Sequence, residues 1–270
     1  MSYFRLKNGM QLYYEDVGTG EPVVFLHGWT SSHAIYDAPV QKLSEKARCI
    51  TYDHRGHYGS KDANGEPVTM ETLASDLKEL IEGLGLDNLT LVGWSMGAGV
   101  VMTYIRDHGC DGLKQVVLCD MTPKQLNDDE WKLGLYQGNY TKEDMERDAS
   151  RKFIKLYQAF AEGAVPKLKK LPGFMVRHLL RKGLKQCDEP VLRTLSKSMK
   201  QLDNRDVIGR ITVPLTYVYA VPGSLFSPEL AEWYRSHANA PFNAVPIANS
   251  AHMLVSEHPD EFAAAIEKLL

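Results

Sequence analysis

A serine in the setting of a nucleophile lies in the stretch GWSMG, where Ser95 stands between Gly93 and Gly97. The apolar run LTLVGW precedes it, and the helical pattern MGAGVVMTYIRDHG follows. A strand that passes into a helix through one residue strains the backbone there, and the flanking positions must lack side chains. The bend lifts the hydroxyl clear of the sheet at a helix N-terminus, which favours developing negative charge. The pattern predicts that Ser95 is a nucleophile, with an ordinary Gly-rich turn as the alternative.

A histidine that could activate this serine lies near the end of the chain. Serine alone is a poor nucleophile and needs a base. His252, in NSAHMLVSEHP, follows the last strand-like run and precedes the last helical pattern. We therefore expect it on a loop at the carboxyl end of a strand, where open α/β sheets build their sites. His258 precedes Pro259 and is typical of the start of the final helix, so His252 is the predicted base.

Two backbone N–H groups are candidates for an oxyanion hole, which acyl transfer needs because charge develops on the carbonyl oxygen. The stretch FLHGWTSS ends a strand-like run and turns at once, which would direct the Trp29 N–H toward the site. The Met96 N–H, directly after the serine, would be the second donor.

Trp94, Met121 and Met253 adjoin these motifs. They are expected to line an apolar acyl pocket, with core packing as the alternative.

The elements that must position these residues alternate between strand and helix. The Asn8-Gly9 turn in YFRLKNGMQLYYEDVG indicates a β-hairpin. Apolar runs typical of strands follow: PVVFLHG, RCITYDH, LTLVGW, QVVLCDM, LTYVYAV and NAVPIAN. Most are continuous rather than alternating, as in strands that are buried on both faces of a parallel sheet. Helical patterns between several of them predict an α/β fold with a mostly parallel central sheet flanked by helices.

One segment interrupts the alternation. From about residue 122 to 206 there is no convincing strand, but helix-like stretches such as DASRKFIKLYQAFAEGA and VLRTLSKSMKQL occur. About eighty residues is too long for a plain connection. We expect residues 122–206 to form a helical cap or lid, with residues 1–121 and 207–270 as the two parts of the core. An elaboration of the surface is the alternative.

The composition is typical of a cytoplasmic protein. The 270 residues allow one large α/β domain with an insertion, and a net charge of -3 gives no reason to expect a nucleic-acid partner. The start MSYFRLKNGM lacks the apolar core of a signal peptide. No apolar run approaches the roughly 20 residues of a membrane span. The four cysteines lack metal-ligand spacing. We therefore expect no metal, other cofactor or membrane partner; a homo-oligomer is left open.

The landmarks LHGW, DHRGHYGS, GWSMGAG and NSAHMLVSEHP resemble those of the α/β-hydrolase superfamily in order and spacing. The likeness covers nearly all of the chain outside the insertion. Within the superfamily, HGW with DHRGH and GWSMG is similar to the branch of small bacterial esterases and cofactor-free haloperoxidases or perhydrolases. The resemblance implies a Ser–acid–His triad with Ser95 as nucleophile, His252 as base, and Trp29 and Met96 as oxyanion donors. The usual RGHGxS appears here as RGHYGS, with Tyr58 in the place of a glycine.

The acid of that triad is missing from its usual place. In most relatives it follows the strand matched here by LTYVYAV, but Gly223 and Ser224 stand there and no Asp or Glu occurs before Glu229. Glu229 begins a helix, where an acidic residue is common for dipole reasons alone. Asp120, at the end of the previous strand in VVLCDMTP, keeps the chain order Ser…Asp…His. Some α/β-hydrolases carry their acid at that position. We predict Asp120, with a Ser–His dyad and Glu229 as the alternatives.

Together these residues predict a serine hydrolase, foremost a carboxylesterase that acts on small or medium acyl esters through an acyl-enzyme intermediate. The expected partner is thus a small-molecule ester substrate. A perhydrolase or haloperoxidase, in which peroxide replaces water at the acyl-enzyme, would use the same residues. A ligand-sensing protein on a hydrolase scaffold is a further alternative, because fold does not fix function.

Overall fold

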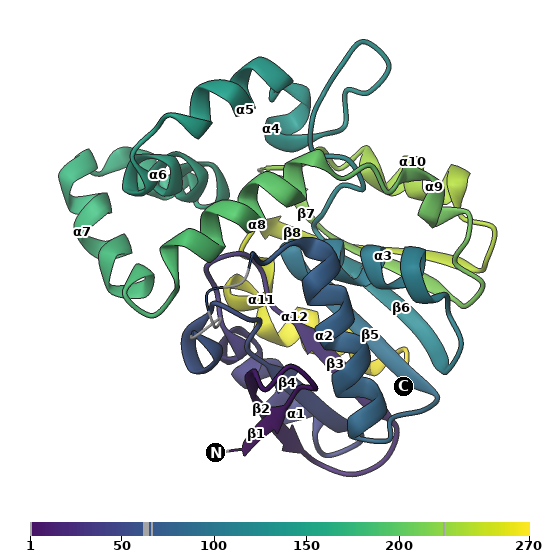
Figure 1. The fold of residues 1–270 in the computed structure, drawn as a ribbon. Coiled ribbons are helices and arrows are strands. Elements are labelled where there is room, and N and C mark those ends of the chain that lie inside the picture. Colours follow the sequence, from purple (N-terminus) through teal and green to yellow (C-terminus); the bar gives the residue numbers. More distant parts are fainter. Residues whose placement is uncertain (1, 62–64, 66, 224) are drawn as a thin grey trace.

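The computed structural model describes residues 2–61, 65, 67–223 and 225–270. An eight-stranded sheet runs through the molecule in the order β1-β2-β4-β3-β5-β6-β7-β8 (Figure 1). The strands are β1 (Ser2–Arg5), β2 (Gln11–Val17), β3 (Pro22–Leu26), β4 (Arg48–Tyr52), β5 (Leu89–Trp94), β6 (Leu113–Cys119), β7 (Leu215–Pro222) and β8 (Phe242–Ser250). β2 pairs antiparallel with β1 and β4, and the pairs from β4 to β8 are parallel. The predicted hairpin and the predicted mostly parallel sheet are both confirmed.

Both faces of the sheet are covered, which explains the continuous apolar runs. Along β3, Val24 and Leu26 belong to one hydrophobic cluster, whereas Val23 and Phe25 belong to another on the opposite face. Helices α2 (Met70–Gly83) and α3 (Met96–His108) pack on the first face, and α1 (Asp37–Leu43) and α12 (Pro259–Glu267) on the second. Successive strand residues point to opposite faces, so a strand between two helical layers is apolar at every position.

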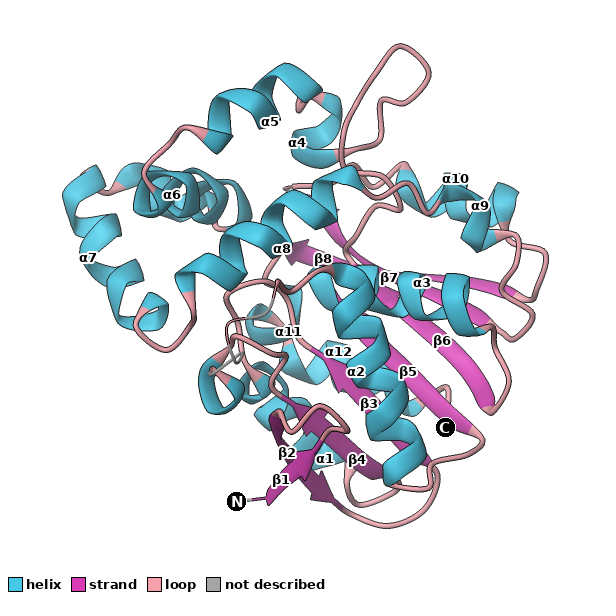
Figure 2. Ribbon diagram, in the orientation of Figure 1, coloured by secondary structure: helices cyan, strands magenta, loops and turns pink. Residues whose placement is uncertain are grey.

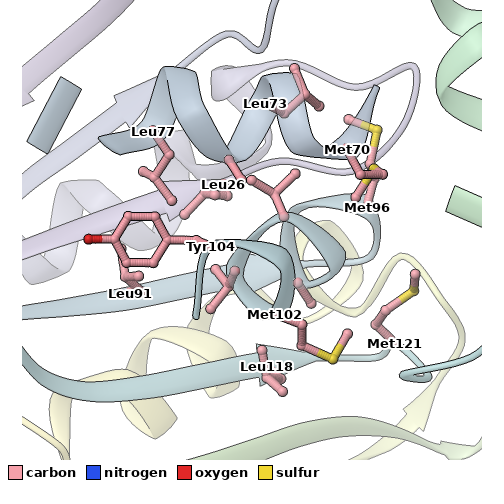
Figure 3. Packing of buried hydrophobic residues seen from close by; sticks show 14 of the residues in the cluster. Leu26, Met70, Leu73, Leu77, Leu91, Met96, Met102, Tyr104, Leu118 and Met121 are labelled. Atoms are coloured by element: carbon pink, nitrogen blue, oxygen red, sulfur yellow. The ribbon is translucent and has the colours of Figure 1, made fainter. Parts of the chain in front are cut away.

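The cluster beneath α2 and α3 forms the larger core. Figure 3 shows Leu73 and Leu77 of α2 beside Leu26 and Leu91 of the sheet. Helix α2 begins with a capping box, in which Thr69 and Thr72 exchange hydrogen bonds between side chain and backbone. The box satisfies N–H groups that the first turn of a helix leaves unpaired. This core holds β5 and α3 rigidly around the serine that connects them.

The segment between β6 and β7 is helical, as predicted, and contains no strand among its residues, all of which the structure describes. It carries α4 (Leu135–Gly138), α5 (Lys142–Ala149), α6 (Phe153–Ala164), α7 (Gly173–Leu184), α8 (Glu189–Gln201) and α9 (Arg205–Ile208). Helices α4 to α7 lie together on one side of the molecule, and α8 crosses between them and the sheet (Figure 2).

The two ends of this helical segment lie side by side. Lys124 and Asp203 form an isolated antiparallel bridge, and the Asn204 N–H donates to the Pro123 carbonyl at 3.0 Å. The segment therefore leaves and rejoins the core at one place. The remaining short helices are α10 (Leu230–His237), before β8, and α11 (Leu254–Glu257), after it. That residues 122–206 form a separate cap stays a prediction.

Candidate active site

Ser95 lies on the one-residue bend between β5 and α3. Its backbone is strained, with φ 55° and ψ −122°, and its N–H donates to the Cys119 carbonyl at 2.9 Å. A Cβ added at Gly93 would lie 2.5 Å from the Gly97 carbonyl oxygen, and one at Gly97 would lie 2.1 Å from that of Leu26. Neither position can hold a side chain, because real Cβ atoms do not approach backbone oxygens so closely. The two glycines thus let α3 pack directly against β5 and β3.

Three side chains from the ends of β5, β6 and β8 form a hydrogen-bonded series. Ser95 Oγ lies 2.9 Å from His252 Nε2, and His252 Nδ1 lies 2.7 Å from Asp120 Oδ2. All three are buried, with 6%, 1% and 2% of their surfaces exposed. The tautomer that satisfies both contacts has Nδ1–H donating to the carboxylate and Nε2 accepting from the serine. In this arrangement the histidine can take a proton from the serine hydroxyl.

The backbone around the histidine and the carboxylate is itself held in place. Asp120 follows β6 with φ 43°, and its Oδ1 accepts from the Ala220 N–H of β7 at 3.3 Å. The Trp94 indole donates to the His252 carbonyl at 2.8 Å.

Glu229, the alternative acid, is exposed at the residue before α10. Of the two residues at the usual acid position, Gly223 has φ 93° and Ser224 lies outside the described residues.

The two N–H groups expected to form the oxyanion hole are buried and unpaired. Trp29 and Met96 are 5% and 0% exposed. Within the described ranges, neither backbone N–H donates to any acceptor. Buried N–H groups are nearly always paired in folded proteins, so two unpaired donors beside one serine need an explanation. A ligand oxygen held at this place would provide their acceptor.

The loop that carries Trp29 is fixed by two histidines that sequence reasoning did not select. The next residue, Thr30, has φ 63°, and its N–H donates to His57 Nε2 at 3.2 Å. His27 Nδ1 lies 2.8 Å from the Gly28 carbonyl, to which it donates. Burial lowers the pKa of His57 to about 4, so its ring is neutral and can accept at neutral pH. The sequence did hold a signal for these two residues, because His27 lies in the motif LHGW and His57 lies in the motif DHRGH.

Two cavities meet at Ser95, and both reach under the helical segment. The larger, of about 430 Å³, is lined by Trp94, His252 and Met253 and by Phe160 of α6. The Phe160 ring lies 5.3 Å from the Trp29 ring and 6.0 Å from that of His252, measured between centroids. The smaller cavity, of about 30 Å³, has room for about one water molecule. The sequence pattern did not distinguish Phe160 from an ordinary core residue.

For Met121, the structure favours the alternative of core packing. The structure places its side chain in the core cluster beneath α2 and α3, beside Gly99, rather than in either cavity at Ser95 (Figure 3). Tyr58, where a glycine was expected, has φ 39° and lines the larger cavity.

The described residues bring together no group of three or more His, Cys, Asp and Glu side chains that could hold a metal ion. In the same ranges no helix has both the length and the apolar character to cross a membrane. The cysteines Cys49, Cys110, Cys119 and Cys187 are all free thiols.

Comparison with known proteins identifies relatives of this fold. Residues 21–245 match a family described as alpha/beta hydrolase fold. The chain is 35% identical over 123 residues to the AB hydrolase superfamily protein YisY of Bacillus subtilis, covering 45% of this chain and 46% of the relative. It is 34% identical over 118 residues to the non-heme chloroperoxidase CPO-A1 of Kitasatospora aureofaciens, covering 43% and 42%. These two alignments thus span less than half the length of each relative.

Among solved structures, the chain is similar to an esterase from Exiguobacterium antarcticum. The TM-score is 0.84 with 24% identity, and the match covers 99% of this chain and 98% of the other. At that level of identity the similarity shows a shared fold.

Proposed function

This chain belongs to the α/β-hydrolase fold family, and we propose that it is a serine carboxylesterase acting on small or medium acyl esters. One observation carries the proposal: Asp120, His252 and Ser95 form a hydrogen-bonded series with distances of 2.7 and 2.9 Å. Fold alone does not fix function. A nucleophile, a base and an orienting carboxylate in contact are the geometry that acyl transfer needs.

In the proposed mechanism, Ser95 Oγ attacks the ester carbonyl carbon while His252 Nε2 takes the hydroxyl proton. The Asp120 carboxylate stabilises the imidazolium that forms, and the N–H groups of Trp29 and Met96 donate to the oxygen that becomes negative. The C–O bond to the alcohol then breaks, and the imidazolium gives its proton to the leaving oxygen. Water, deprotonated by His252, attacks the acyl-enzyme and releases the acid and the free serine.

The larger cavity supports an ester of modest size. Its volume of about 430 Å³ lies in the range of small-molecule sites, and aromatic residues such as Trp94 and Phe160 line it. Phe160 belongs to α6, so the proposed cap at 122–206 covers the nucleophile and limits what can reach it. Such a cover also excludes bulk water, which strengthens the electrostatic interactions inside.

The nucleophile is tested with a fluorophosphonate reagent and short p-nitrophenyl esters. Wild-type protein is expected to be labelled at Ser95 and to lose its esterase activity in proportion. Ser95→Ala should not be labelled and should keep at most a roughly 10³-fold acceleration over water. Ser31 lines the same cavity, so Ser31→Ala is a matched control that should stay labelled and active. Labelling of Ser95→Ala would refute the assignment.

Perhydrolysis is the second candidate, favoured by the similarity of 118 residues of the chain to a non-heme chloroperoxidase. In that reaction hydrogen peroxide attacks the same acyl-enzyme and releases a peracid. Adding peroxide to an ester reaction and measuring halide oxidation by the peracid separates the two activities. Multiple rapid turnovers of an ester without peroxide favour the esterase, whereas a single slow turnover favours a ligand-sensing role.

A further inference from the structure

Large apolar side chains are exposed along helix α7. Phe174 and Leu179 are 67% and 57% exposed, and Met175 and the preceding Leu171 are exposed as well. The other large hydrophobic residues that are exposed in the described ranges lie in the hairpin of β1 and β2: Tyr3 and Val17. Exposed apolar side chains that gather on one element mark a surface that binds another body.

The charges around these apolar side chains are all positive. Residues 163–187 include no aspartate or glutamate, but they include seven basic residues: Lys167, Lys169, Lys170, Arg177, Arg181, Lys182 and Lys185. In the ranges that the structure describes, none of the seven forms an ion pair with an acidic side chain. The chain as a whole carries a net charge of -3, so this segment is a local excess of positive charge on a negative protein.

The apolar and the basic side chains share one face of α7. Residues three and four positions apart lie on the same side of a helix, and two exposed rows follow that spacing: Phe174, His178, Arg181 and Lys185, and Met175, Leu179 and Lys182. We call these seven residues the α7 face. The other side of the helix is held on α6, where Arg177 Nη1 donates to Gln158 Oε1 at 2.8 Å. Figure 2 shows α7 at the outer edge of the helical segment, away from the sheet.

The same helix contributes to the wall of the larger cavity at Ser95. Leu180, which follows the exposed Leu179, lines that cavity, as does Leu168 in the turn before α7. A partner on the α7 face would therefore lie one helix away from the cavity that holds the nucleophile.

We propose that the α7 face docks on the surface of an anionic lipid bilayer. Lysine and arginine side chains are attracted to negatively charged headgroups, and Phe174, Met175 and Leu179 enter the boundary between headgroups and acyl chains. A nucleic acid would match the charge but would leave these apolar side chains in water, because its binding depends on phosphate contacts.

The proposed contact is peripheral. Helix α7 has 12 residues, fewer than the roughly 20 that span a bilayer, so it would lie in the plane of the interface. The expectation of no membrane partner rested on the lack of a long apolar run. That lack argues against a spanning segment and not against attachment to a surface.

The test is co-sedimentation of the full chain with lipid vesicles. Vesicles of phosphatidylcholine mixed with phosphatidylglycerol should bind the protein at least about tenfold more tightly than vesicles of phosphatidylcholine alone. Raising NaCl to about 0.5 M should weaken this binding, because salt screens exposed charges. Equal binding to the two kinds of vesicle, or no binding to the mixed vesicles, overturns the proposal.

Two double variants separate the apolar from the basic contribution. Phe174→Ser with Leu179→Ser removes apolar contacts, and Arg181→Gln with Lys182→Gln removes two charges. Each should weaken binding to the mixed vesicles at least about tenfold. None of the four residues lines a cavity at Ser95, so thermal unfolding and ester hydrolysis without vesicles should stay as in wild type.

Exposed residues elsewhere on the chain provide matched controls. Tyr3→Ser with Val17→Ser removes two exposed apolar side chains, and Lys7→Gln with Lys268→Gln removes two exposed charges. Both control variants should bind the mixed vesicles as tightly as wild type. If they weaken binding as much as the α7 variants do, the contact does not lie on the α7 face and the proposal is wrong.

An acidic protein is the competing partner, and poly-L-glutamate serves as its probe because it supplies negative charge without an apolar phase. Binding to poly-L-glutamate but not to the mixed vesicles would mean that the α7 face serves an acidic protein, and the lipid proposal fails. If Phe174→Ser with Leu179→Ser weakens binding to vesicles and leaves any binding to poly-L-glutamate unchanged, the lipid proposal is supported.

Discussion

Asp120→Asn exchanges one oxygen for an NH₂ group at the point where two buried side chains meet. Asp120 Oδ1 accepts from the Ala220 N–H at 3.3 Å, and Oδ2 lies 2.7 Å from His252 Nδ1. An asparagine that keeps the first contact with its oxygen turns its NH₂ group toward Nδ1. Nδ1 must then accept, and the ring proton moves to Nε2, 2.9 Å from Ser95 Oγ. In that tautomer the histidine cannot take the serine proton.

The size of the effect follows from what is lost and what remains. In serine proteases with a Ser–His–Asp triad, replacing the aspartate by asparagine lowers kcat about 10⁴-fold. This raises the activation free energy by about 5.5 kcal/mol, at 1.36 kcal/mol for each tenfold change. The serine and both proposed oxyanion donors remain in Asp120→Asn. We expect kcat to fall by about 10²- to 10⁴-fold. KM should change little, because Asp120 lines neither cavity at Ser95.

The assay is steady-state hydrolysis of p-nitrophenyl butyrate at saturating ester, with thermal unfolding to establish that the variant is folded. Glu229→Gln is the control, since this exposed residue should not affect kcat. Activity of Asp120→Asn within threefold of wild type, or loss of activity in Glu229→Gln instead, would refute the reasoning. An aspartate added at Gly223 should rescue little. The φ there is 93°, and a Cβ would lie 2.8 Å from the Phe226 carbonyl oxygen.

Three further outcomes are expected. His57→Leu should lower kcat about tenfold for all acyl lengths, because the Thr30 N–H loses its acceptor; His57→Gln should lose less, since its amide oxygen can accept. Gly97→Ala should destabilise the fold by about 3 kcal/mol in urea unfolding, because its Cβ meets the Leu26 carbonyl oxygen at 2.1 Å. Burial lowers the pKa of His54 to about 3 and that of His57 to about 4. Below the unfolded value of about 6.5, the unfolded chain binds protons that the folded chain does not, so stability is lost as pH falls. The free energy of unfolding should drop by about 1.4 kcal/mol per pH unit for each histidine between those values; equal urea midpoints at pH 7 and pH 5 would contradict this.

Local signals explain which features the sequence could predict. Ser95 and His252 each lie in a short pattern that specifies both the residue and its place at the end of a strand. The continuous apolar runs predict strands because both faces of the sheet are buried. Asp120 needed a longer argument from the neighbouring strand ends, and the structure brings its carboxylate to His252 Nδ1. The catalytic role of Asp120 stays a prediction.

Other features depend on packing that no local pattern records. Met121 adjoins Asp120 in sequence, yet its side chain points into the core. Lys200 stands in an amphipathic helix, where a lysine normally marks the solvent face, yet the residue is only 8% exposed. Phe160 reaches His252 from a helix almost a hundred residues away in the chain.

The adjacent ends of the helical segment affect how this molecule can evolve. Because Pro123 and Asn204 are hydrogen-bonded neighbours, insertions, deletions or replacement of the helices between them leave the distance between β6 and β7 unchanged. Ser95, His252 and Asp120 all lie outside that segment, whereas Phe160, which lines the larger cavity, lies within it. Mutations there can retune which ester is accepted without altering the reacting groups. Chemistry and selectivity thus occupy separately mutable parts of one chain, and exchanging the segment with that of a relative is a direct route to a new substrate range.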